Sequence, residues 1–166
     1  MSSMRWSWLI PALVAASAAS ALSLPALAET RAHDHNAAAP HEVTLDQGRK
    51  WATDAPLRDG MDRIRALVEP QLADAHAGKL SQAQYTAIAV RIESEVGGIV
   101  ANCKLEPKAD EALHVVIGEI GAGTDAMTGK VAKQRPAQGL VQVANAVNDY
   151  AGHFDHPGFK AIRKIQ

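Results

Sequence analysis

Cysteine and aromatic residues are scarce in this sequence of 166 residues, and their scarcity excludes several kinds of protein. Cys103 is the only cysteine, so no disulfide can form within one chain. Aromatic residues make up 4% of the sequence and runs of β-branched residues are short, which disfavours strand-rich sandwiches and barrels. The formal net charge of −1 gives no electrostatic reason to expect nucleic acid as a partner.

The common catalytic and cofactor motifs are also missing. The sequence has no C-x-x-C-H haem attachment motif, no H-E-x-x-H, no G-x-S-x-G and no P-loop. Gly121, Gly123 and Ala126 have the spacing of a dinucleotide-binding loop, but the alternating strands and helices of that fold are not there. We therefore expect these glycines to loosen or end a helix, and we expect that the protein is not an enzyme.

The first 28 residues are predicted to be a secretory signal peptide. Arg5 is their only charge, an apolar run follows it, and Ala26-Leu27-Ala28 offers a cleavage site of small residues. Pro11 and Pro25 interrupt the run, which weakens a transmembrane interpretation. The prediction is a periplasmic protein with no transmembrane segment after cleavage, and with enough remaining chain for one domain.

Residues 29–43 are polar and rich in alanine, and they show no periodicity. They contain three histidines, at positions 33, 35 and 41. We expect a flexible arm here. Thr44 and Gln47 have the spacing of a capping box, so a short helical turn is expected to carry Trp51.

Residues 44–156 are predicted to form an antiparallel up-down-up-down bundle of four amphipathic helices. Apolar residues recur there at spacings of three and four, as in the first helix at Leu57, Met61, Ile64, Val68 and Leu72. The expected helices run from Thr53 or Asp54 to Gly78 with a kink at Pro70, from Ser81 to before Pro107, from Pro107 to about Met127, and from Pro136 to about His153. Short loops between helices of this length are typical of an all-α bundle.

A metal site is predicted at one end of this bundle. The topology brings together the start of the first helix, the end of the second, the start of the third and the end of the fourth. This end would hold Met61, Cys103, His114, His153 and His156. Thioether, thiolate and imidazole are preferred ligands of copper(I) and haem iron. The residues therefore predict a copper-binding or copper-handling protein, with the arm histidines capturing or delivering the ion.

Two resemblances add to this interpretation. APLRDGMDRIRALVEPQL, LHVVIGEI and NDYAGHF resemble segments of the soluble periplasmic four-helix cytochromes of b type. That resemblance implies an electron-transfer protein with non-covalent haem b between Met61 and His153. KWATDAPLRDGM, ANCKLEPKADEALHVVIGEI and FDHPGF resemble small exported proteins labelled DnrO-like, which implies export and little about mechanism.

Three functions stay open from the sequence. Copper at the Met/Cys/His site uses the extra thiol, which a haem site does not need. Haem b between Met61 and His153 is the second alternative. The third is an interaction module without metal that binds a periplasmic protein partner through residues 157–166. This tail alternates Phe159, Ile162 and Ile165 with basic residues, and we expect it to pack back on the end of the bundle that holds the predicted metal site.

Overall fold

A computed structural model describes residues 42–163 of the chain. The predicted signal peptide and the three arm histidines lie outside the described residues, as does Ile165 of the tail. No helix in residues 42–163 is both long and apolar enough to cross a membrane.

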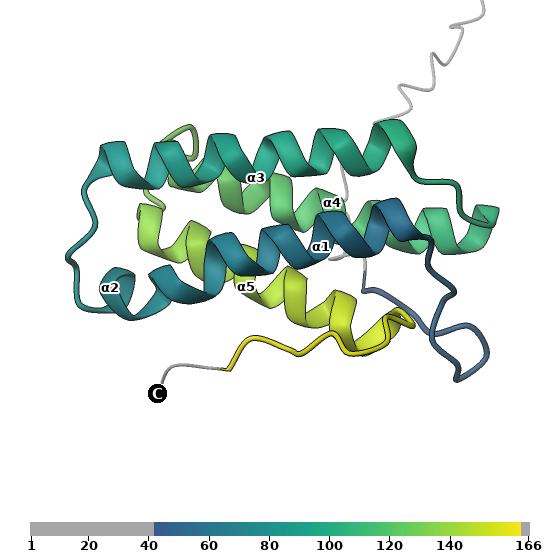
Figure 1. Cartoon of the computed structure of the whole chain (residues 1–166). Coiled ribbons are helices and arrows are strands. Elements are labelled where there is room, and N and C mark those ends of the chain that lie inside the picture. Colours follow the sequence, from purple (N-terminus) through teal and green to yellow (C-terminus); the bar gives the residue numbers. More distant parts are fainter. Residues whose placement is uncertain (1–41, 164–166) are drawn as a thin grey trace, which may run out of the picture. The chain divides into compact units, whose positions relative to one another are not determined.

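The described part of the chain is all helical apart from its loops and two isolated bridges. Its elements are α1 (Ala55–Val68), the 3-10 helix η1 (Glu69–Gln71), α2 (Leu72–His76), α3 (Gln82–Asn102), α4 (Pro107–Met127) and α5 (Pro136–His153). α2 continues the direction of α1, and these two with α3, α4 and α5 pack as four antiparallel rods (Figure 1). This confirms the predicted fold class.

Local chemistry at the helix ends explains the boundaries. The Asp54 carboxylate accepts a hydrogen bond of 3.0 Å from the third residue of α1. Ser81 and Gln84 form the predicted capping box at the start of α3. α4 and α5 begin with Pro107 and Pro136, at the position where proline is best tolerated. Pro70 lies in η1, where a 3-10 turn interrupts the α-helical hydrogen bonding between α1 and α2.

The prediction of a helical turn before Trp51 is wrong. Asp46 and Arg49 close a tight turn in which Gln47 and Gly48 have φ values of 50° and 85°, so the backbone reverses instead of starting a helix. Trp51 then pairs with the end of α5: its N–H donates to the carbonyl of His153 over 2.8 Å. Val43, placed in the predicted arm, is 8% exposed and belongs to the core.

The C-terminal segment packs back on the bundle as far as the structure describes it. It runs along α5 after the helix ends (Figure 1). Asn148 holds it with two hydrogen bonds to the backbone of Ile162, of 2.7 and 3.2 Å. Ile162 is 4% exposed, and the Phe159 ring lies edge-on to Tyr150 with ring centroids 5.1 Å apart. The tail packs back as expected, but not only at the predicted end: Ile162 lies in a groove with Leu72 and Ala75, at the opposite end of the bundle.

Helices α4 and α5 touch backbone to backbone at two glycines. A Cβ on Gly123 would lie 2.8 Å from the carbonyl oxygen of Gly139, and a Cβ on Gly139 would lie 2.8 Å from the amide nitrogen of Met127 and would also collide with the carbonyl oxygen of Gly123. α4 continues through Gly121 and Gly123 to Met127. The expectation that these glycines loosen or end the helix is therefore wrong, because Gly123 is needed for close packing.

Gly139→Ala is predicted to destabilise the fold by about 3 kcal/mol, because the new methyl meets backbone atoms that cannot rotate away. Gly121→Ala is the matched control: it lies in α4 with open space around its Cα, and it should stabilise the helix by up to about 1 kcal/mol. Urea unfolding followed by circular dichroism measures both changes. Equal stability of the two variants would contradict the close contact.

Candidate functional site

The start of α1, the end of α3 and the end of α5 lie at one end of the bundle, as the sequence predicts. We call this region the Cys103 end. The Lys104 amide, just after α3, donates to the Asp54 carboxylate before α1 over 2.6 Å. Trp51 joins the same region to the end of α5 at His153. The topology that the helix pattern predicts thus brings the candidate residues to one end, but the directions of their side chains differ.

Cys103 is half-buried and carries a protonated thiol. It caps α3 in an extended conformation, with φ −68° and ψ 140°, and its thiol lies near the Asp54 carboxylate. Burial, together with the negative charges of Asp54 and Asp110, raises the pKa of the thiol to about 12. Because the thiolate is the form that binds metals and attacks electrophiles, this arrangement holds Cys103 in its unreactive form.

Met61 and His153 do not share a cavity. Met61 is 0% exposed and is packed on every side within the core. His153 lines a groove between α4 and α5 that does not include Met61, and its Nδ1 is 2.7 Å from the Asp149 carbonyl oxygen. A haem between the two side chains would have to enter the packed core at Met61, and haem binding there stays a prediction from the sequence.

His114 and His156 lie in different surroundings. The His114 side chain is 63% exposed and its Nδ1 is 2.8 Å from the Asp110 carbonyl oxygen. The His156 side chain is 6% exposed and both of its nitrogens have partners. Within residues 42–163, no group of three or more histidine, cysteine, aspartate or glutamate side chains is placed to hold a metal ion. A site that unites the five predicted ligands therefore stays a prediction.

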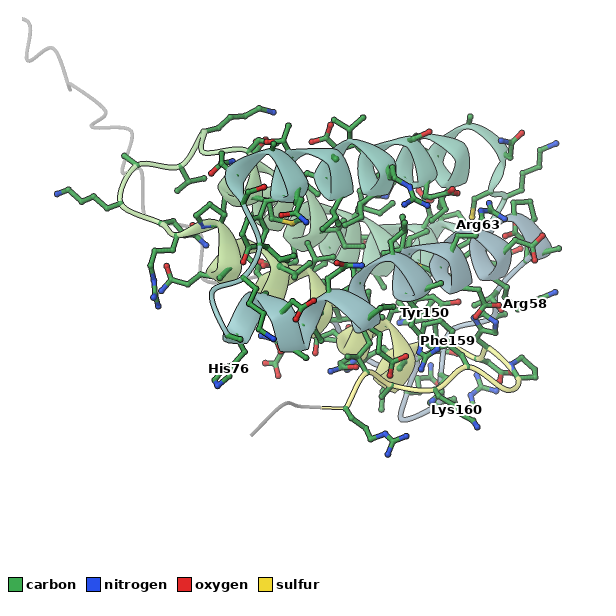
Figure 2. The ribbon with its side chains drawn as sticks, turned by 60° about the vertical axis from the view of Figure 1, so that its left-hand side comes forward. Arg58, Arg63, His76, Tyr150, Phe159 and Lys160 are labelled. Atoms are coloured by element: carbon green, nitrogen blue, oxygen red, sulfur yellow. The ribbon has the colours of Figure 1, made fainter. Side chains whose placement is uncertain are left out.

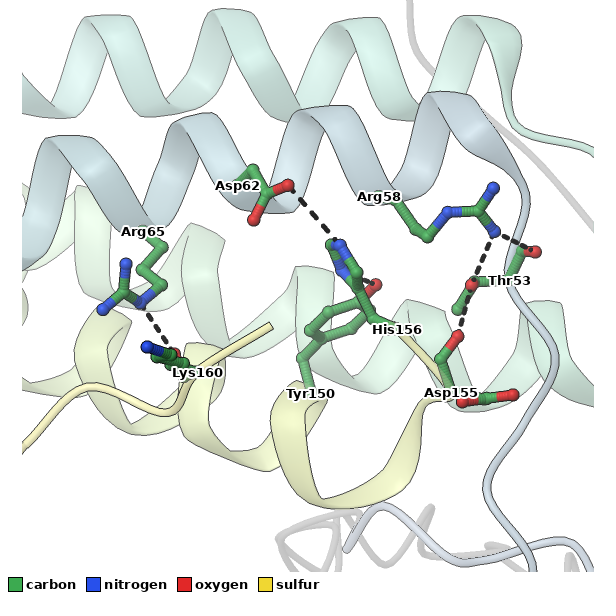
Figure 3. A network of polar contacts seen from close by, with 8 residues as sticks. All are labelled: Thr53, Arg58, Asp62, Arg65, Tyr150, Asp155, His156 and Lys160. Atoms are coloured by element: carbon green, nitrogen blue, oxygen red, sulfur yellow. Dashed lines mark hydrogen bonds and ion pairs between the residues drawn. The ribbon is translucent and has the colours of Figure 1, made fainter. Parts of the chain in front are cut away.

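His156 belongs instead to a polar network that fastens the C-terminal segment to α1 (Figure 3). Its Nε2 is 3.4 Å from an Asp62 carboxylate oxygen and its Nδ1 is 3.0 Å from the Tyr150 hydroxyl. With a proton on Nε2, the ring donates toward Asp62 and accepts from Tyr150. Burial lowers the pKa of His156 although Asp62 acts to raise it, and burial raises the pKa of Tyr150.

The network has two further ties to α1. Arg65 donates from Nε to the Lys160 carbonyl oxygen over 2.7 Å. The Thr53 hydroxyl donates to the Asp155 carbonyl oxygen over 2.6 Å and accepts from Arg58 over 3.1 Å (Figure 3). The network therefore holds residues 155–160 along α1, which is a structural task.

The groove beside His153 has a volume of about 530 Å³. A second groove lies at the other end of the bundle, between α2, α5 and the C-terminal segment. We call it the α2–α5 groove; its volume is about 490 Å³. Its apolar lining residues are Leu72, Ala75, Ala137, Val141, Ala144 and Ile162. Leu72, Ala75, Ala144 and Ile162 are at most 8% exposed, whereas Val141 is 49% exposed. The groove thus has an apolar floor that is open to solvent at its edge.

The polar lining of the α2–α5 groove is basic. It contains His76, Arg135 and Arg163, together with the neutral amides of Gln138, Asn145 and Asn148. None of the described residues that line it is an aspartate or a glutamate. His76 lies at the end of α2, away from Arg58 and Arg63 near the Cys103 end (Figure 2). No pattern in the sequence indicates this groove, because its residues come from three segments that share no motif.

The chain matches no protein-family model, no curated protein and no solved structure. The resemblances to b-type cytochromes and to DnrO-like proteins therefore stay expectations drawn from short sequence segments. Its function has to be argued from the residues themselves.

Asp54→Asn is predicted to make Cys103 more reactive, because it removes the charge that keeps the thiol protonated. Asparagine caps helices about as well as aspartate, so α1 should keep its start, while the Lys104 amide loses its acceptor because asparagine has one acceptor oxygen. The rate of maleimide addition at pH 8 should rise about tenfold for each unit by which the thiol pKa falls. Asp59→Asn, an exposed change on the same helix, is the control. Equal rates in all three proteins would show that Asp54 does not hold the thiol proton.

Proposed function

We propose that this protein is a binding protein and not an enzyme, and that its ligand is a small molecule with an apolar body held in the α2–α5 groove. The observation that carries the proposal is the groove itself. Its volume of about 490 Å³ lies within the range of about 300–1,000 Å³ of small-molecule sites. Six of its twelve lining residues are apolar and six are polar, so it offers both an apolar surface and polar groups that can orient a ligand.

The proposal that the protein is not an enzyme rests on the protonation and the position of two candidate nucleophiles, Cys103 and Tyr150. The Cys103 thiol is protonated beside Asp54, and the Tyr150 hydroxyl is buried and its pKa is raised. Neither residue lines the α2–α5 groove. Since a catalytic group must reach its substrate, these side chains support a structural role better than a chemical one.

Copper binding at the Cys103 end is the second candidate function. The observation in its favour is that a free, half-buried thiol lies at the end where α5 and its His153 also finish. Copper(I) would have to displace the thiol proton, which burial and the charge of Asp54 favour, and so the site would form only with rearrangement. Haem b at Met61 and His153, and a periplasmic protein partner, stay predictions from the sequence. The proposed periplasmic location also rests on the sequence alone.

The groove proposal predicts saturable binding of one Nile red molecule, an uncharged apolar dye whose fluorescence rises out of water. Ala137→Trp, which places an indole at the groove, should weaken this binding by about tenfold or more, since the dye and the indole need the same volume. Ala87→Trp on the exposed face of α3 should leave it unchanged. Absence of saturable binding, or equal affinities in the two variants, would sink the proposal.

The copper candidate predicts that the full chain takes up one equivalent of copper(I) in competition with a chromogenic chelator, and that Cys103→Ala abolishes this uptake. His114→Ala tests whether the exposed imidazole takes part, and Met61→Leu tests the thioether while keeping the core filled. Copper uptake that is unchanged in Cys103→Ala would remove the thiol from the site and this candidate with it.

A further inference from the structure

We propose that the ligand of the α2–α5 groove is an amphipathic anion, a molecule with an aliphatic body and a carboxylate head. This inference rests on the proposed function, because it names the chemical class that the same groove selects. It is carried by the position of the charges around the groove and by the apolar residues beneath them.

Arg135 and Arg163 approach the groove from separate elements. Arg135 precedes the first residue of α5, and Arg163 lies in the C-terminal segment directly after Ile162, which forms part of the groove floor. Asn148 fixes Ile162 through two backbone hydrogen bonds, and this limits where the Arg163 side chain can reach. A guanidinium group can grip a carboxylate, whose two oxygens match its paired donors. Because Asn148 lies about 20 Å along α5 from Arg135, the two arginines offer such a group toward opposite ends of the groove.

Neither arginine forms an ion pair with another residue in the described range. The ion pairs there use other cations, at Arg49, Arg63, Arg65, Lys79 and Lys130, and two histidines. Because no carboxylate lines the groove, the positive potential at its rim is not neutralised within it. The α5 dipole acts in the same direction, since Ala137 and Gln138 of its first turn also line the groove and no acidic residue lies in that turn.

The apolar residues at the floor of the groove select the body of the ligand, as the arginines select its head group. Leu72, Ala144 and Ile162 are buried and present aliphatic carbon, so an aliphatic chain can lie on them while the head group stays at the basic rim. A free inorganic anion would leave this floor bare, and an uncharged alkane would leave the arginines without a partner. The ligand that satisfies both parts carries a carboxylate on an aliphatic chain.

The test compares decanoate with decanol, which has the same chain length and no charge, by competition with Nile red on the full chain at pH 7.5. Decanoate should bind about tenfold more tightly than decanol. Arg135→Gln and Arg163→Gln should each reduce this preference, and the double variant should abolish it while decanol binding remains. Arg91→Gln on the exposed face of α3 is the charge-matched control and should change nothing.

The outcomes separate this inference from the proposed function. Equal binding of decanoate and decanol to the wild-type protein would overturn the anion and leave the groove as a site for apolar ligands. No displacement of the dye by either compound, with no saturable dye binding, would overturn both. If decanol binds more tightly to Ile165→Asp than to the wild-type protein, the chain's own C-terminal residues compete for the groove and are its occupant. If the protein forms a dimer that dissociates in Ala137→Trp, the occupant of the groove is a second copy of this chain.

Discussion

The backbone contact between α4 and α5 at Gly123 and Gly139 is the constraint on which the rest of this bundle depends. With no Cβ on either residue, the two helices approach until carbonyl oxygens and side chains of one meet the backbone of the other. This contact fixes the position of α5 along its axis relative to α4. In that position the Val143, Val147 and Tyr150 side chains of α5 fill the core. Backbone contact of this kind resists change more than side-chain packing does, because no rotamer can relieve a collision.

The two ends of α5 then have different tasks. Near its end, Tyr150 meets His156 and holds the C-terminal segment, which continues to Ile162 and closes one side of the α2–α5 groove. Near its start, Arg135 lies at the rim of the same groove, so one helix joins the polar network to the proposed site. The network therefore contributes to binding through position alone: it fixes the segment that supplies Ile162 and Arg163.

The helices could be predicted because apolar spacing and end residues act locally. The periodicity from Leu57 to Leu72, the capping box at Ser81 and the prolines at 107 and 136 each act within a few residues of where they lie. The site could not, because side-chain direction at a helix end depends on the chain beyond it. Cys103 has the extended backbone of a cap while its side chain still packs against the core, and His156 turns toward Asp62. Arg135 and Arg163 are brought to one groove by tertiary packing.

The central claim is that binding takes place at the α2–α5 groove and not at the Cys103 end. Amide correlation spectra of the isotopically labelled full chain, recorded as decanoate is added, test it most directly. The account predicts saturable shifts at Ala75, His76, Ala144 and Ile162, with Asp54, Cys103 and Lys104 unmoved. Shifts confined to the Cys103 end, or no shifts up to the solubility limit of decanoate, would contradict it.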